Sequence, residues 1–131
     1  VSWEHTDARG LFEGTFDGYA QLLSDDISHH RRIDVNADER VITVQDSVTG
    51  AGEHAVASRI HLHPEVAIRR ETNVFVLQRA GKECRIVVEK GAVRQEKGWY
   101  CPRFGVRHRN CVLVIGGRAS LPVELTYRIW Y

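Results

Sequence analysis

"RVITVQDSV", residues 40–48, has the pattern that decides the fold, because its apolar side chains recur with a period of two. Successive side chains of an extended chain point to opposite faces, so Ile42, Val44 and Val48 share one face. The stretch is also rich in Val, Ile and Thr, which favour strands. It predicts a β-strand with one face in a hydrophobic core.

Strand-like runs of the same kind recur along the chain and are separated by turn signals rich in Gly, Asn and Asp. They are "HAVASRIHLH" (54–63), "EVAIRRE" (65–71), "NVFVLQRA" (73–80), "ECRIVVEK" (83–90), "CVLVIGG" (111–117) and "LPVELTYRIWY" (121–131). The stretch most able to form a helix, residues 18–25, is only about two turns long and reads equally well as strand. We therefore expect an all-β fold, an antiparallel β-sandwich of two layers of short strands joined by hairpin turns.

The size and composition indicate one globular domain over residues 1–131, with 43% hydrophobic and 27% charged residues. The net charge of +1 argues against nucleic-acid binding, and the basic run "HHRR" (29–32) would split between the two faces of a strand. No apolar run approaches the roughly 18 residues that span a bilayer, so we expect no membrane partner. The three cysteines show none of the spacings of zinc or redox motifs.

The tryptophans Trp3, Trp99 and Trp130 each lie in strand-like sequence. A large ring in such a strand more often fills a sandwich core than it forms a platform for a sugar. We therefore expect all three rings to contribute to the core.

Two histidines one residue apart, His61 and His63, lie in the strand-like run "RIHLHPEV" (59–66) and would point to the same face. They could supply two ligands to zinc if a third came from elsewhere. The spacing alone favours a simpler interpretation, in which one imidazole hydrogen-bonds a neighbour and the other is solvated. A cupin-like metal centre is not indicated, because the nearest upstream glycine, Gly52, is too far away.

Nothing in the chain indicates a catalytic nucleophile or a phosphate-binding loop. Cys101 has no acid–base partner nearby in the sequence, and the serines lack the glycines of a nucleophile elbow. The step from Asp17 to Gly18 is, by itself, typical of a turn. We expect no catalytic residue within this chain.

Several segments occur together in an order that resembles one known family, the C-terminal β-domain of heparinase II/III-like proteins. They are "FDGYAQL" (16–22), "SHHRRIDVNAD" (28–38), "ITVQDSVTGAGEH" (42–54), "SRIHLHPEV" (58–66), "WYCPRFGVRHRNCVLVIGG" (99–117) and "LPVELTYRI" (121–129). Each segment is weak evidence, but their order and spacing extend over residues 13–130. The resemblance agrees with the sandwich expected from the strand pattern.

The resemblance implies a fragment of a polysaccharide lyase, in which a large upstream α/α toroid and the β-sandwich together enclose an acidic polysaccharide. Such enzymes remove the proton beside a uronate carboxylate and eliminate the 4-linked sugar, which requires a neutralised carboxylate, a base and an acid. In the family most of these groups come from the toroid, so this chain alone is expected to be inactive. Relatives are often exported, but any signal would lie upstream.

The resemblance also suggests site residues in this chain. The family's β-domain often holds zinc with two His and one Asp, and Asp17 and His63 match two of those ligands, whereas the first His would lie upstream of Val1. Phe16 stands where relatives often have His.

Plausible cleft residues are Arg31, Arg32, Arg59 and His61, because guanidinium and imidazole groups suit carboxylates and sulfates. The alternative function is a non-catalytic carbohydrate-binding β-sandwich module.

Overall fold

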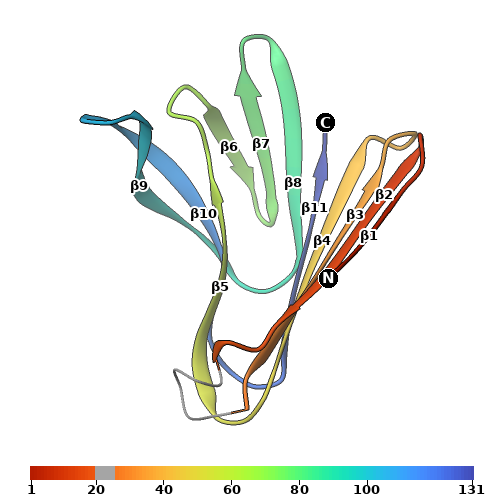
Figure 1. Cartoon of the computed structure of the whole chain (residues 1–131). Helices are drawn as coiled ribbons and strands as arrows, with labels where there is room; N and C mark the ends of the chain where they lie inside the picture. Colours follow the sequence, from red (N-terminus) through yellow and green to blue (C-terminus); the bar gives the residue numbers. More distant parts are fainter. Residues whose placement is uncertain (20–25) are drawn as a thin grey trace.

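The computed structural model describes residues 1–19 and 26–131, and its elements are antiparallel β-strands in two sheets (Figure 1). The larger sheet has eight strands, in the spatial order β1 (Ser2–His5), β2 (Arg9–Phe16), β3 (Ser28–Asn36), β4 (Val41–Thr49), β11 (Val123–Trp130), β8 (Lys82–Lys90), β7 (Val74–Arg79) and β6 (Ala67–Glu71). The smaller sheet has three, in the order β5 (Glu53–His61), β10 (Val106–Ser120) and β9 (Val93–Arg103). The predicted all-β antiparallel sandwich is therefore confirmed.

Most of the stretch considered for a helix, residues 20–25, lies outside the described residues. Within the part of the chain that the structure describes, no helix is long and apolar enough to cross a membrane.

The strand predicted at residues 40–48 is β4, which pairs with β3 on one side and β11 on the other. Its inward face is buried as expected, with Val44 at 5% and Val48 at 7% exposure. Ile42, on the same face, is only partly buried and packs against the edge of the core. The period-two pattern thus positions this strand in the larger sheet.

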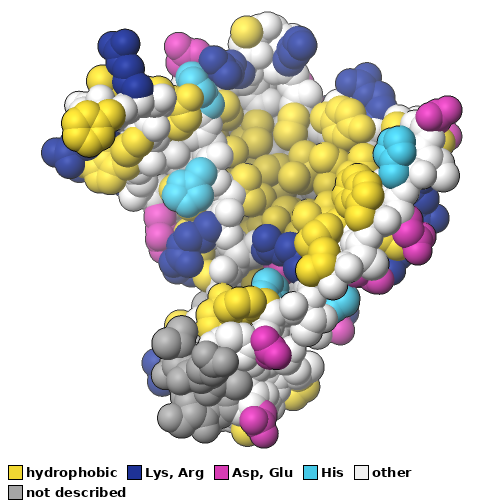
Figure 2. Space-filling view, in the orientation of Figure 1, with side chains coloured by type: hydrophobic (Ala, Val, Ile, Leu, Met, Phe, Trp, Pro, Cys, Tyr) yellow, Lys and Arg dark blue, Asp and Glu magenta, His cyan; other side chains and the backbone are white. Residues whose placement is uncertain are grey.

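The core lies between the two sheets and is densest where β7, β8 and β11 face β10. Phe75 and Leu113 are completely buried, and Ile86 is 1% exposed. No residue of the core cluster comes from β1 or β2, so the smaller sheet covers only part of the larger one. Figure 2 shows the result: hydrophobic side chains gather in an open hollow on one face of the molecule.

The expectation that all three tryptophans fill the core is wrong: none of them belongs to the core cluster, and Trp130 on β11 is only partly buried. Trp3 on β1 is 63% exposed and Trp99 on β9 is 41% exposed. Strand β1 is the edge strand of the larger sheet, and the outer part of β9 extends past the core. An alternating pattern identifies a strand, but it does not say whether the opposite sheet reaches that far.

The outer parts of β9 and β10 form a projecting hairpin, residues 96–109, which we call the β9–β10 arm (Figure 1). The arm is fixed at its base by the buried Asn110, whose Nδ2 donates to the carbonyl of Leu62 at 2.9 Å. Gly98 lies directly opposite Asn110, and a Cβ there would come within 2.7 Å of Asn110 Oδ1. Gly98 therefore permits the close approach on which this anchor depends.

Replacing Asn110 with alanine is expected to lower the free energy of unfolding by about 1 to 3 kcal/mol, because the buried Leu62 carbonyl loses its side-chain donor. Urea unfolding monitored by circular dichroism measures the change. The control is Asn36→Ala, which removes an exposed hydrogen bond to the backbone of Glu39. Equal losses in the two variants would contradict the anchor assigned to Asn110.

Candidate functional site

The larger sheet carries a buried carboxylate, Asp46 on β4, with a side-chain exposure of 3%. Asp46 accepts hydrogen bonds from Arg31 Nε at 2.6 Å and from Arg31 Nη2 at 2.8 Å. His29 Nε2 lies 2.7 Å from Asp46 Oδ1. Burial alone would raise the pKa of Asp46, but the hydrogen bonds from Arg31 and His29 hold that pKa below its ordinary value. The carboxylate is therefore ionised at neutral pH.

The strand register explains why these groups meet. Arg31 on β3 lies directly opposite Asp46 on β4, and opposite residues of an antiparallel pair project from the same face. His29 precedes Arg31 by two positions, so its side chain shares that face. An ionised carboxylate can only accept hydrogen bonds, so His29 Nε2 donates its proton to Asp46 Oδ1.

A polar chain connects this group to the smaller sheet. Arg31 Nη2 donates to Ser58 Oγ on β5 at 3.1 Å, and Ser58 Oγ lies 3.4 Å from the hydroxyl of Tyr127 on β11. Ser58 and Tyr127 are 5% and 6% exposed. The two sheets are thus joined by hydrogen bonds as well as by apolar packing, and such a network fixes the position of each member.

A pocket of about 280 Å³ opens beside this network, between β3, β4 and β5. Its polar lining is mostly imidazole, hydroxyl and guanidinium, from Tyr19, His29, Arg31, His54, Ser58 and Arg59. Among the described lining residues the one carboxylate is Asp46, which is already engaged by Arg31 and His29. A pocket with this lining suits an anionic group, because guanidinium groups pair with carboxylates and sulfates.

Among the predicted cleft residues, Arg59 is an exposed guanidinium in the pocket lining. Within residues 1–19 and 26–131 it makes no ion pair, so its donors are available to a ligand. His61 follows two positions later on β5 and is also exposed. Both residues therefore project from one face of this edge strand.

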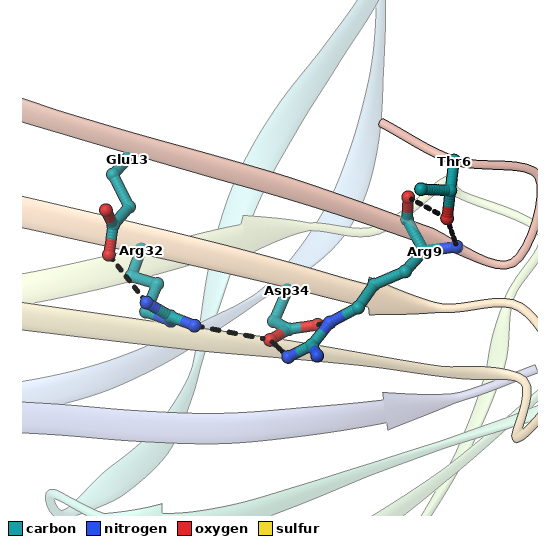
Figure 3. Close-up of polar contacts among 5 residues, drawn as sticks. All are labelled: Thr6, Arg9, Glu13, Arg32 and Asp34. Atoms are coloured by element: carbon teal, nitrogen blue, oxygen red, sulfur yellow. Dashed lines mark hydrogen bonds and ion pairs between the residues drawn. The ribbon is translucent and has the colours of Figure 1, made fainter. Parts of the chain in front are cut away.

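Arg32 lies on the opposite face of β3 from Arg31, as the split of the "HHRR" run predicted. Figure 3 shows its guanidinium between two carboxylates, 2.7 Å from Glu13 Oε1 and 3.5 Å from Asp34 Oδ2. Asp34 also pairs with Arg9, whose Nε lies 3.1 Å from Asp34 Oδ1. The structure therefore separates Arg32 from Arg31 and the pocket, and a substrate role for Arg32 stays a prediction.

The two predicted metal ligands lie in different parts of the sequence and of the fold. Asp17 follows the end of β2, whereas His63 follows β5 and contacts the ring of Tyr100, with 4.9 Å between the ring centroids. In the described part of the chain, no group of three or more His, Cys, Asp or Glu side chains could hold a metal ion. These residues alone do not provide the ligand set of a zinc site, so zinc binding stays a prediction.

Two other histidines that could have completed a metal site have partners of their own. His29 is bound to Asp46, and His30 Nδ1 lies 3.1 Å from Thr15 Oγ1. Phe16, at the position where relatives often have His, is 53% exposed and packs edge-on against Tyr19.

The sequence reasoning missed Asp46 as a site residue. A signal was present, because Asp46 falls on the same face as Val44 and Val48, where an acidic side chain must have partners.

Comparison with known proteins agrees with this fold. Residues 2–127 match the family described as heparinase II/III-like, C-terminal. The chain belongs to that family. The fold is also similar to that of heparan sulfate lyase HepC from Pedobacter heparinus, with a TM-score of 0.78, 12% identity and coverage of 98% of this chain and 21% of that one.

A heparinase III is similar with a TM-score of 0.74, 16% identity and coverage of 98% of this chain and 20% of that one. The chain thus spans about a fifth of the length of these solved structures. A search of curated protein sequences finds no significant match.

Proposed function

We propose that this chain is the C-terminal β-sandwich of a heparinase II/III-like polysaccharide lyase and forms one wall of the cleft for an acidic, uronic-acid-containing polysaccharide. Family membership supports the class of enzyme, and the similar solved structures include a heparan sulfate lyase. The observation that carries the proposal is the pocket beside Asp46, whose lining includes Arg31 and His29, both held by Asp46, and Arg59, which makes no ion pair within the described residues.

The proposed chemical role of this wall is to neutralise and orient the substrate. Elimination next to a uronate carboxylate becomes easier when a cation neutralises that carboxylate, because the cation stabilises the negative charge that develops as the neighbouring proton is removed. Arg59 supplies that cation, while Arg31 is held in place by Asp46. The remaining acid and base come from an upstream α/α domain, so the wall has no turnover alone.

The test is a substitution in the full-length parent protein. Arg59→Gln is expected to lower kcat/KM on heparan sulfate by about tenfold or more, because charge-assisted hydrogen bonds to the uronate are lost. Arg118→Gln is the control, since Arg118 is an exposed arginine on the same sheet that pairs with Glu53 and is not among the lining residues of the pocket. Wild-type kcat/KM in Arg59→Gln would contradict the role of the pocket.

Zinc remains part of the proposal only as an ion shared with residues outside this chain. Asp17 and His63 are the ligands that the family resemblance suggests, and because they lie in different parts of the fold, each would bind zinc only together with ligands from outside this chain. Metal analysis of the chain purified without chelators is expected to find zinc well below one ion per chain. One tightly held zinc ion per chain would contradict this expectation.

A further inference from the structure

The β9–β10 arm carries a concentration of positive charge, and its one carboxylate, Glu96, is at the base of the arm and pairs with Arg94. Residues 97–110 include Lys97, Arg103, Arg107 and Arg109 and contain no Asp or Glu. All four cations are exposed. Because the whole chain has a net charge of only +1, this concentration of charge is local to the arm.

Two of these arginines are arranged around one tryptophan ring. The Cζ atoms of Arg109 and Arg107 lie 3.6 Å and 4.5 Å from the ring centroid of Trp99. Arg109 is also the residue directly opposite Trp99 across the strand pair. Stacking restricts the guanidinium planes but leaves their N–H groups free to donate at the edges, so less side-chain entropy is lost when an anion binds.

The opposite face of the arm is attached to the body of the protein. Tyr100 contacts the ring of His63, and Asn110 donates to the carbonyl of Leu62. Both residues alternate with Trp99 and Arg109, so the attachment and the cationic face are on opposite sides of the hairpin. The cationic face is therefore held in position and left open.

The strand register also gives the direction of this face. Arg109 has the same parity along β10 as Leu113 and Ile115, which lie on the core side of the smaller sheet. The cationic face thus continues the core side of that sheet beyond the core. Figure 2 shows cationic and aromatic side chains together on the projecting arm at the upper left, beside the hydrophobic hollow.

We propose that the cationic face of the β9–β10 arm binds the sulfate or carboxylate groups of an acidic polysaccharide, as a surface separate from the Asp46 pocket. The choice of polysaccharide rests on the proposed function. Nucleic acid fits less well, because Arg107 and Arg109 already occupy the ring of Trp99 on which a base would stack. Binding to this exposed face needs no residues from an upstream domain, so the chain alone should bind the polysaccharide.

The experiment is a calorimetric titration of the chain with heparan sulfate oligosaccharide at two salt concentrations. The variant Arg107→Gln/Arg109→Gln is expected to bind about tenfold more weakly, with a shallower salt dependence. The control Arg118→Gln/Arg128→Gln removes two exposed positive charges away from the arm and should bind as the wild type does. Arg107→Lys/Arg109→Lys, which keeps the charge but loses the planar stacking, should give an intermediate affinity.

The proposal is overturned if the wild-type chain does not bind, or if both glutamine double variants lose the same affinity. It is also overturned if anionic lipid vesicles or duplex DNA bind as tightly as heparan sulfate at the same salt. The proposed function is tested by a different measurement, the effect of Arg59→Gln on kcat/KM in the parent enzyme. If the arm variant binds weakly while Arg59→Gln has the kcat/KM of the wild type, the proposal for the arm is supported and the role proposed for the pocket is contradicted.

Discussion

Val44→Asp is expected to leave the chain unfolded at room temperature. Val44 is 5% exposed in the centre of the larger sheet, where Ile33 and Tyr127 are its cross-strand neighbours. Arg31 on the same face is already held by Asp46, so a carboxylate at position 44 would be buried without a free partner. Burying it costs about 5 kcal/mol or more, which is comparable to the stability of a whole domain. Far-ultraviolet circular dichroism and gel filtration measure the loss of structure.

Two variants of the same strand serve as controls for that result. Gln45→Asp adds the same charge at an exposed position and is expected to fold. Ile42→Asp adds the charge on the same face as Val44, but Ile42 is only partly buried, so the loss of stability should be smaller than that of Val44→Asp. If Val44→Asp melted at the temperature of Gln45→Asp, the assigned faces of β4 would be wrong.

Asp46→Ala should cause the second largest loss, about 3 kcal/mol, because it leaves Arg31 and His29 without their common partner inside the protein. The estimate stays at the low end for a buried pair because the Arg31 side chain is 38% exposed and can turn toward water. Asp34→Ala is the matched control. Asp34 pairs with the exposed Arg9, and such a pair contributes about 1 kcal/mol or less. Denaturant unfolding gives both values.

The effect of Asp46 should also depend on pH, with a defined sign. Its pKa is lower in the folded chain than in the unfolded one, so its contribution to stability is complete above the unfolded value and disappears as the pH falls through the folded value. The stability difference between the wild type and Asp46→Ala should therefore shrink below about pH 4. A difference that stayed constant in acid would show that Asp46 is not held as an ion pair.

The strands that the sequence predicted best are those with one apolar face on the core, such as β4, β7 and β8. Strand β9 was predicted only in part: Trp99 was expected in a strand, but "EKG" at residues 96–98 is typical of a turn. In the structure Gly98 is instead inside the strand, where it makes room for Asn110. The first three strands carry few buried residues, so their sequences lack a strong period-two pattern.

The candidate site was predictable only in part. The split of Arg31 and Arg32 between two faces follows from strand geometry and is confirmed. The contacts of Arg31 with Asp46 and Ser58 depend on which strands become neighbours and in what register, and local sequence does not encode that. The exposure of Trp99 likewise depends on the extent of the opposite sheet.

We propose that this chain is a non-catalytic wall of a lyase cleft, and an assay for turnover by the isolated chain tests that proposal. Residues 1–131 are incubated with heparan sulfate while the ultraviolet absorbance of unsaturated uronate is followed, with the full-length parent protein assayed in parallel. We expect the parent protein to form this product and the isolated chain to form none. Product formed by the isolated chain, at a rate that Arg59→Gln abolishes, would contradict it.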